Sequence, residues 1–276
     1  MHTVVANGAK IPAIGFGTYG MARSDMLRII PAALKGGFRH IDTAQIYRNE
    51  EEVGECIASS GIPRSEIFVT TKVWVANYPE SRFVSSVDES PRKLRSEYID
   101  LLLLHWPHDG VPLAEQIGLL NETVRAGKVR HIGVSNFNRR LLDQATGLSA
   151  VPLVTNQFEY HPYLNQSLVI DATRKARLAV TAYCAMAVGR VLTDPTITEI
   201  ADSHGRTIPQ IVLRWLVQQD DVVALSRTTN LDRIVENLTV FDFELGEDQM
   251  AAIQALARPN SRIVNPIGLA PVWDAS

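Results

Sequence analysis

Four polar residues, Asp42, Tyr47, Lys72 and His105, are of the types that can supply and position a proton. A free tyrosine, with a pKa of about 10, is a poor donor at neutral pH, so its pKa would have to be lowered. An ammonium near the phenol stabilises phenolate, and a carboxylate beyond it keeps that ammonium charged, roles that suit Lys72 and Asp42. A neutral His105 could polarise a carbonyl oxygen. These types predict hydride reduction of a carbonyl, with Tyr47 as the proton donor.

This prediction depends on the four residues meeting in one place. Asp42, Lys72 and His105 each end a short apolar run, and Tyr47 follows Asp42 in a loop. Alone, each has a commoner structural explanation, such as a solvated charge, a packed tyrosine or a hydrogen-bonded core histidine. A fold that gathers strand ends on one rim would bring them together.

Short apolar runs alternate with amphipathic segments along the chain. The eight predicted strands are Ile14 to Thr18, Phe38 to Thr43, Ile67 to Val73, Ile99 to His105, Val129 to Ser135, Leu153 to Gln157, Ala179 to Ala182 and Val222 to Ser226. Strands that alternate with helices are parallel, and the continuous apolar run LLLLH suits a strand buried on both faces. The pattern predicts a (β/α)₈ TIM barrel, whose active site lies at the carboxyl ends of the strands.

Local signals add detail to this barrel. Asn7-Gly8 between short apolar stretches predicts an N-terminal β-hairpin. A helix is expected over Ser24 to Gly36, and Thr207 is expected to cap another helix. Pro91 lies inside the predicted helix Ser81 to Ser96, which we expect it to kink or interrupt. No linker rich in Pro, Gly or Ser divides the chain, so residues 1–276 are expected to form a single domain.

A glycine-rich motif suggests a competing fold. Gly15, Gly17 and Gly20 match G-x-G-x-x-G after a predicted strand, and Asp42 follows 22 residues after Gly20. This spacing is typical of a Rossmann dinucleotide site. However, the best helix cap, Ser24-Asp25, comes several residues after the motif. The barrel prediction instead makes the glycines turn and close-approach residues at the barrel mouth.

Composition restricts the partners. The 276 residues are 46% hydrophobic and 21% charged, with a formal net charge of −3. This balance gives no electrostatic footprint for nucleic acid or an anionic membrane, and no apolar stretch is long enough to span a bilayer. The N-terminus lacks the features of a signal peptide, and the two cysteines, Cys56 and Cys184, predict buried thiols in a reducing compartment. We expect a cytoplasmic protein with a small-molecule partner.

Six motifs occur in order along the chain: DTAQIYRNEEEVG, TTKVW, DLLLLHWP, IGVSNF, TNQFEYHP and RIVENL. Together they resemble the aldo-keto reductase superfamily over essentially the whole chain, and the C-terminal VNPIGLAPVWD is most similar to bacterial 2,5-diketo-D-gluconate reductases. The resemblance implies NADPH-dependent reduction of aldehydes or ketones by a monomer. It also implies a catalytic tetrad, which falls on Asp42, Tyr47, Lys72 and His105.

The resemblance further implies a nicotinamide site and a site for the adenosine 2′-phosphate. The expected cofactor-binding residues are Thr18, Asp42, Ser135, Asn136, Gln157, Tyr183, Arg227, Thr228, Arg233, Glu236 and Asn237. Among these, Tyr183 is expected to stack on the nicotinamide, and Arg227 and Arg233 to favour NADPH over NADH. Tyr19, Trp74 and Trp106 match aromatic positions of the family's substrate pocket. The chain departs from the common family pattern at Cys184-Ala185-Met186 and at Arg227-Thr228, near the expected pyrophosphate and 2′-phosphate.

The last helix is expected to end near Ala257, leaving Arg258 to Ser276 as a short extended tail over the rim. A short tail favours small polar carbonyls, such as methylglyoxal or a diketo sugar acid, over steroid-sized ketones. Two other functions would use parts of the same sequence. A metal-dependent hydrolase using His105, His108, Asp109 and His161 lacks a strand-borne His-x-His pair, so no metal is expected. A non-catalytic NADPH-binding barrel would not need the whole tetrad.

Overall fold

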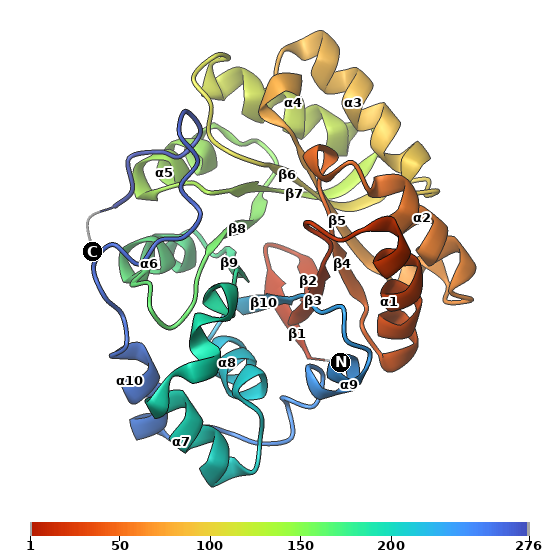
Figure 1. The fold of residues 1–276 in the computed structure, drawn as a ribbon. Helices are drawn as coiled ribbons and strands as arrows, with labels where there is room; N and C mark the ends of the chain where they lie inside the picture. The colour runs from red at the N-terminus through yellow and green to blue at the C-terminus, as the bar shows by residue number, and fades with distance from the viewer. Residues whose placement is uncertain (1, 275–276) are drawn as a thin grey trace.

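The computed structural model describes residues 2–274, which form a closed barrel of eight parallel strands surrounded by helices (Figure 1). The barrel strands are β3 (Ile14–Gly17), β4 (His40–Asp42), β5 (Phe68–Val73), β6 (Ile99–Leu104), β7 (Val129–Ser135), β8 (Leu153–Glu159), β9 (Ala179–Tyr183) and β10 (Val222–Ser226). Each pairs with the next along the chain, and β10 closes the barrel by pairing with β3. The predicted (β/α)₈ barrel is confirmed.

The α-helices pack around this barrel. They are α1 (Arg23–Gly36), α2 (Glu50–Ser59), α3 (Glu80–Lys93), α4 (Leu113–Arg125), α5 (Arg139–Leu148), α6 (Ser167–Lys175), α7 (Pro195–His204), α8 (Ile208–Val217), α9 (Asp232–Glu236) and α10 (Glu247–Gln254). Short 3₁₀ helices lie in the loops: η1 (Gln45–Tyr47), η2 (Arg64–Glu66), η3 (Val75–Asn77) and η4 (Ala187–Thr193). Within the described residues, no helix is both long and apolar enough to cross a membrane.

The leucine run of β6 shows why continuous apolar sequence makes a barrel strand. Leu102 and Leu104 belong to the core between barrel and helices, whereas Leu101 and Leu103 belong to a separate core inside the barrel. Successive side chains of a strand point to opposite faces, so a strand buried on both faces needs no polar alternation.

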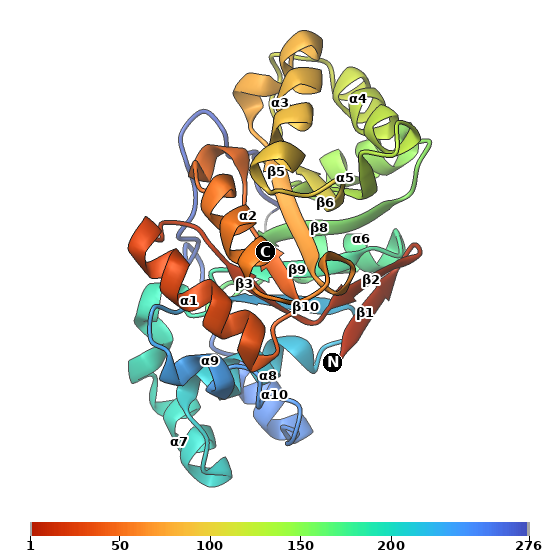
Figure 2. The ribbon, with the colours of Figure 1, turned by 90° about the vertical axis from the view of Figure 1, so that its right-hand side faces the viewer.

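An N-terminal hairpin, β1 (Thr3–Ala6) and β2 (Ala9–Pro12), covers the amino-terminal end of the barrel (Figure 2). Its Ala6, Ala9 and Ile11 pack against the inner leucines of β6. Asn7 and Gly8 both have positive φ, as the Asn-Gly turn requires, and the Asn7 amide donates to Leu153 O at 2.7 Å. The predicted hairpin is confirmed, and it leaves the carboxyl ends of the strands free for the site.

Local predictions were confirmed with three corrections. The predicted cap Ser24-Asp25 lies inside α1, which begins at Arg23 with Ala22 at its N-cap. Thr207 caps α8 in a capping box with Gln210. Pro91, however, does not interrupt α3: it lies in the last turn, and the helix continues to Lys93, three residues short of the predicted end at Ser96. The proline lacks one N–H donor to the carbonyl four residues before it, but the helix ends only two residues later, so little of the helix lies beyond the proline. The last helix, α10, ends at Gln254, slightly before the predicted Ala257.

The glycine motif belongs to the barrel wall and its first loop. A β-carbon on Gly15 would lie 2.6 Å from His40 Nδ1 and 2.6 Å from Leu225 Cδ2, so only glycine fits there. Gly20 has a φ of +65° and turns the chain toward α1. A closed barrel is not the open sheet of a Rossmann fold, so the competing interpretation is wrong.

Candidate active site

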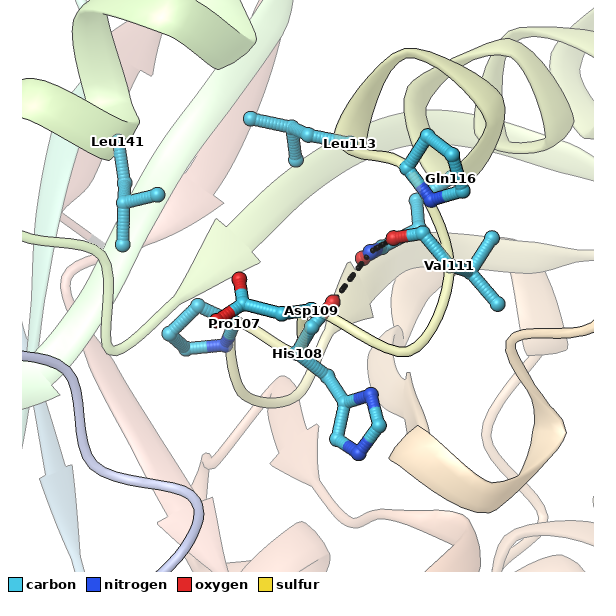
Figure 3. A pocket seen from close by; sticks show the side chains of 8 residues that line it. Pro107, His108, Asp109, Val111, Leu113, Gln116 and Leu141 are labelled. Carbon is cyan, nitrogen blue, oxygen red and sulfur yellow. Dashed lines mark hydrogen bonds between the residues drawn. The ribbon is translucent and has the colours of Figure 1, made fainter.

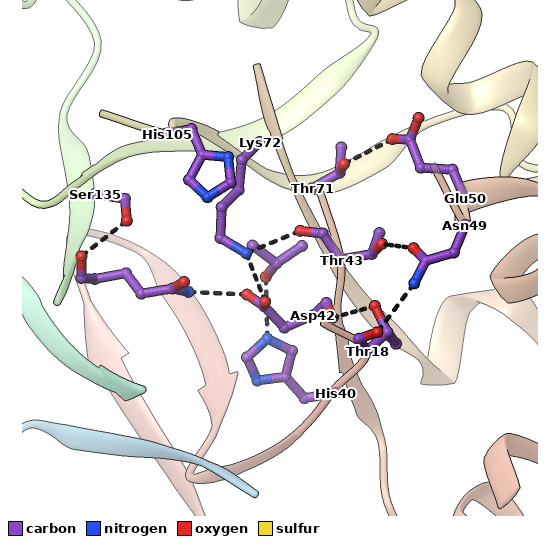
Figure 4. A network of polar contacts seen from close by, with 12 residues as sticks. Thr18, His40, Asp42, Thr43, Asn49, Glu50, Thr71, Lys72, His105 and Ser135 are labelled. Atoms are coloured by element: carbon purple, nitrogen blue, oxygen red, sulfur yellow. Dashed lines mark hydrogen bonds and ion pairs between the residues drawn. The ribbon is translucent and has the colours of Figure 1, made fainter. Parts of the chain in front are cut away.

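A buried ion pair joins the ends of β4 and β5. Lys72 Nζ donates to Asp42 Oδ1 at 2.5 Å and to the carbonyl of Thr43 at 2.8 Å. The other carboxylate oxygen of Asp42 accepts from Gln157 Nε2 at 2.8 Å. Both charged side chains are buried, so each depends on these partners (Figure 4).

Tyr47 and His105 lie beside this pair. The Lys72 ammonium is 5.2 Å from the centroid of the Tyr47 ring. The Tyr47 and His105 rings meet edge to face, with centroids 5.7 Å apart. His105 follows β6 directly and is largely buried, and its Nδ1 has no hydrogen-bond partner in the part of the chain that the structure describes. The structure thus brings the four predicted residues together on one rim, with an imidazole free to bind a ligand.

The pKa of each of these side chains follows from burial. Burial raises the pKa of Tyr47 well above its ordinary value, and the Asp42 charge adds to the effect. Burial lowers the pKa of Lys72, against the opposing pull of Asp42, and lowers that of His105 far below its ordinary value, with Lys72 contributing. The expectation of a lowered Tyr47 pKa is therefore wrong for this structure, because burial of the phenol and the charge of Asp42 both disfavour the phenolate. Tyr47 is held as a protonated phenol and His105 as a neutral imidazole.

Most residues predicted for the nicotinamide form one network around this rim. Asn136, with a left-handed φ of 64°, donates to His105 O at 3.0 Å and accepts from the Tyr183 hydroxyl at 2.7 Å. Ser135 donates to Gln157 O at 2.9 Å, and Gln157 reaches Asp42. Thr18 is fully buried and donates to Asp42 O, so its side chain supports the rim from behind.

The residues predicted to bind the adenosine end of the cofactor lie after β10, and they differ from one another in exposure and in hydrogen bonding. Arg227 is exposed and donates to Gly20 O at 3.1 Å, which links the loops after β10 and β3. Arg233 is exposed on α9, and Thr228 is mostly buried in a turn with Asn230. Glu236 is instead bonded to the Thr207 hydroxyl, and Asn237 is buried. The two arginines are therefore the accessible cations of this group.

The three predicted pocket aromatics differ in exposure. Tyr19 is 70% exposed, and its ring centroid is 5.0 Å from that of Tyr47. Trp74 is half-buried, and its ring centroid is 5.4 Å from that of His105. Trp106 is buried, and its ring lies 6.4 Å from Trp273 of the C-terminal segment. Aromatic side chains thus surround Tyr47 and His105, and the tail contributes to this wall.

Sequence reasoning missed several residues that hold the rim. Asn49 accepts from the Thr43 hydroxyl at 2.7 Å and donates to Thr18 O at 3.0 Å, so it ties the loops after β3 and β4 together. Tyr78 donates to Trp106 O at 2.7 Å. Asn49 lies inside the quoted motif DTAQIYRNEEEVG, but a buried amide cannot be told from a surface one by its type alone.

The loop after His105 encloses a separate small cavity of about 110 Å³, lined by residues that include Pro107, His108, Gln116 and Leu141 (Figure 3). Gln116 Nε2 donates to the carbonyls of His108 and Val111, which fixes the loop. None of the four rim residues lines this cavity, so it is separate from the candidate active site.

No cluster of three or more His, Cys, Asp or Glu side chains suited to a metal occurs within residues 2–274. His161, one of the ligands considered for a hydrolase, is bonded to Glu159 instead. Cys56 is buried and Cys184 half-buried; both are free thiols, and burial raises the pKa of each to about 11. The prediction of two buried thiols is thus correct for Cys56 only.

The loop after β9, where the chain departs from the common family pattern, has an unusual backbone. Cys184, Ala187 and Val188 all have left-handed φ values, of 60°, 45° and 55°. This conformation is rare for a β-branched residue such as Val188. The chain therefore departs from the common family pattern at a loop whose backbone conformation is itself uncommon.

Comparisons with known proteins agree with this geometry. The model of the Aldo/keto reductase family matches residues 13–258. Methylglyoxal reductase DkgB of Salmonella typhi is 39% identical over 267 residues, which cover 96% of this chain and 99% of the relative. Morphine 6-dehydrogenase of Pseudomonas putida is 38% identical, over 91% of this chain and 89% of its own. A crystal structure described as a "putative 2,5-diketo-D-gluconic acid reductase B" is 59% identical, with a TM-score of 0.98 over 100% of this chain and 98% of that chain.

The family match includes all eight barrel strands, and the alignments cover 89–99% of the relatives' lengths. The same matches support the oxidoreductase class, since the relatives are named as reductases or as a dehydrogenase. This chain is an enzyme of the aldo/keto reductase family.

Proposed function

We propose that this enzyme reduces small polar aldehydes, dicarbonyls or keto acids to alcohols with NADPH, and that Tyr47 donates the proton. The observation that carries the proposal is the Asp42–Lys72 pair, set against Tyr47 and His105 at the carboxyl ends of the strands. This is where barrel enzymes place their chemistry.

The residues around this rim fit a nicotinamide. Ser135, Asn136 and Gln157 offer a hydroxyl and two amides within one hydrogen-bonded network, and the Tyr183 ring adjoins them. Gln157 donates to Asp42 through Nε2, and within the described residues its amide oxygen accepts no hydrogen bond, so it could accept one from the cofactor. When bound, the cofactor would supply the hydride. The chain would hold its amide with these three side chains and its ring against Tyr183.

Side chains of the protein would then stabilise the negative charge on the substrate oxygen and donate a proton to it. A neutral His105 would donate a hydrogen bond to the substrate oxygen, where negative charge develops. Tyr47, kept protonated by its surroundings, would donate its proton to that oxygen. Lys72 would favour the resulting phenolate through its positive charge, while Asp42 holds the ammonium in place. A phenolate close to an ammonium is stabilised most when water is excluded.

Preference for NADPH would come from the loop after β10. Arg227 and Arg233 are exposed cations there, and a guanidinium can bind a phosphate through two donors. NADH has no 2′-phosphate, so these contacts would favour NADPH alone. Thr228 and Asn237 would support the loop, whereas Glu236 would first have to leave Thr207 to meet the adenine.

The substrate would be small because the wall around Tyr47 and His105 is crowded. Tyr19, Trp74 and Trp106 line it, and the C-terminal segment adds Trp273. The names of two relatives refer to methylglyoxal and to 2,5-diketo-D-gluconic acid, and small polar carbonyl compounds of this kind agree with such a wall. We further propose that residues 1–276 form a single domain. The hairpin packs in one core with the inner leucines of β6, and Glu159 at the end of β8 binds the C-terminal segment.

The test is a substrate panel followed by the loss of NADPH absorbance. It should contain methylglyoxal, a diketo sugar acid, an aryl aldehyde and a steroid ketone, with NADH in parallel. We expect the first two compounds to have the highest kcat/KM values. No turnover of any of the four compounds would contradict the proposed reduction, and a steroid ketone as best substrate would contradict the proposed substrate class.

A further inference from the structure

Glu159, the last residue of β8, is a buried carboxylate to which the proposed mechanism gives no role. Its side chain is fully buried. Oε1 accepts from Ile263 N at 2.7 Å, and Oε2 accepts from Val264 N at 2.8 Å. His161 Nε2 lies 2.9 Å from Oε1. One carboxylate therefore binds two successive backbone N–H groups that are more than a hundred residues away in sequence.

These N–H groups belong to the C-terminal segment, Arg258–Asp274. This segment has no helix or strand of its own, so side chains of the barrel must hold it. Besides the Glu159 bonds, Arg262 donates to Gln166 Oε1 at 3.3 Å, and Gln166 in turn donates to the carbonyl of Glu159 at 2.6 Å. The attachment is thus concentrated around Glu159.

One aromatic residue, Trp273, connects the C-terminal segment to the proposed substrate wall. The Arg262 guanidinium lies 3.6 Å from the centroid of the Trp273 ring. The Trp273 indole donates to Asn265 Oδ1 at 2.8 Å, and its ring meets Trp106 edge to face. The residues next to Ile263 and Val264, which Glu159 binds, therefore fix the position of Trp273 beside Trp106.

A second attachment lies at the end of the segment. Asn138 Nδ2 donates to Val272 O at 2.7 Å, and Asp274 accepts from Arg139 N at 2.9 Å. Asn138 comes two residues after Asn136, just as Glu159 comes two residues after Gln157. Both attachments thus lie next to the strand ends that carry the proposed nicotinamide residues. The same two strand ends therefore position the C-terminal segment and the proposed nicotinamide site.

We infer that Glu159 is a positioning residue for substrate specificity: it anchors the C-terminal segment so that Trp273 closes the substrate wall against Trp106. The inference rests on the proposed function in so far as that wall selects the substrate. A fully buried carboxylate is costly unless its oxygens are well satisfied. Here the hydrogen bonds from His161, Val264 and Ile263 outweigh the effect of burial and lower the pKa of Glu159, so the anchor is the charged form.

The substitution Glu159→Gln tests the anchor with little change of shape. A carboxamide has only one acceptor oxygen, so its NH₂ group would face one of the backbone N–H donors. Hydrogen exchange should then be at least tenfold faster in peptides that contain Ile263 and Val264. Asp100→Asn is the matched control, because Asp100 is a buried strand carboxylate that also accepts a backbone N–H, from Val69 at 3.0 Å, but lies at the opposite end of the barrel. It should leave the exchange of the tail unchanged.

A double-mutant cycle tests the consequence for specificity. Glu159→Gln should raise KM for methylglyoxal more than it lowers kcat, and should shift the kcat/KM ratio of methylglyoxal to an aryl aldehyde at least fivefold toward the bulkier compound. In a Trp273→Ala background the same substitution should shift that ratio less than twofold, since the wall is already open. Circular dichroism and a thermal melt establish that each variant is folded.

The outcomes separate the two proposals. Unchanged exchange at Ile263 and Val264 in folded Glu159→Gln would overturn the anchor, whatever the activity. An equal shift in both backgrounds would show that Glu159 acts on the site without Trp273, which also overturns the inference. If the unmodified enzyme reduced no carbonyl compound, the proposed function would fail while the exchange experiment still decided the anchor.

Discussion

The Lys72 ammonium lies 2.5 Å from the Asp42 carboxylate, and both side chains are buried at the rim of the barrel. Because the second hydrogen bond of the ammonium goes to Thr43 O and not to Tyr47, the pair is a structural unit as well as a proposed catalytic one. Substitution of Asp42 should therefore lower both the stability of the fold and the turnover number, and the two effects can be measured independently.

Asp42→Ala should lower the free energy of unfolding by about 3–5 kcal/mol, because it leaves a buried ammonium without its counterion. Urea unfolding measures this loss. The control is Asp25→Ala, which breaks the exposed Arg28–Asp25 pair and should change stability by less than about 1 kcal/mol. Equal effects of the two substitutions would mean that the buried pair adds no more than a surface pair.

Tyr47→Phe should reduce kcat by at least roughly a hundredfold, because general acid catalysis contributes about 10²- to 10⁴-fold. NADPH affinity, measured by fluorescence titration, should change only a few-fold, since the proposed cofactor contacts are made by other residues. His105 substitution should also reduce turnover strongly. Near-normal turnover by Tyr47→Phe would rule out the phenol as proton donor.

Arg227→Ala should raise KM for NADPH at least tenfold and leave KM for NADH nearly unchanged, because a charge-assisted bond to the 2′-phosphate contributes roughly 1.5–3 kcal/mol. The bond from Arg227 to Gly20 O is lost in both cases, so the NADH measurement is the internal control for the loop. Equal losses with both cofactors would show that Arg227 acts only by joining the two loops.

Stability should fall as the pH decreases from 7 to 5. Burial lowers the pKa of His40 from 6.5 to about 4, so between these values the unfolded chain binds a proton that the folded chain does not. The unfolded state is therefore favoured as the pH falls, by about 2 kcal/mol for this residue between pH 7 and pH 5. Urea unfolding of His40→Gln at the two pH values should show a smaller decrease than the unmodified protein, and an equal decrease would exclude His40 as the source.

A protein that ends after Asn265 should lose its preference for small substrates. This deletion keeps Ile263 and Val264 on Glu159 but removes Trp273 from Trp106. We expect the kcat/KM values for methylglyoxal and a diketo sugar acid to fall relative to those for the aryl aldehyde and the steroid ketone. Unchanged rates and ranking would show that the tail does not limit the pocket.

The order of elements could be read from the sequence because it is encoded by neighbours in the chain. Continuous apolar runs such as LLLLH, the Asn7-Gly8 turn and the Thr207 cap each depend on a few adjacent residues, and the structure confirms them. The parallel alternation then requires the strand ends to meet. That is why Asp42, Lys72 and His105 could be grouped before their geometry was known.

Only the tertiary structure decided what each polar group bonds to. The ammonium of Lys72 bonds to Asp42 and Thr43. Burial and the charge of Asp42 raise the pKa of Tyr47, where the sequence had predicted a lowered value. Glu236 bonds to Thr207, and Glu159 binds backbone groups of the tail. Each of these outcomes depends on which of many distant donors comes within about 3 Å and on how much water is excluded there. Such contacts join parts of the chain that are far apart in sequence, so no local pattern of residue types determines them.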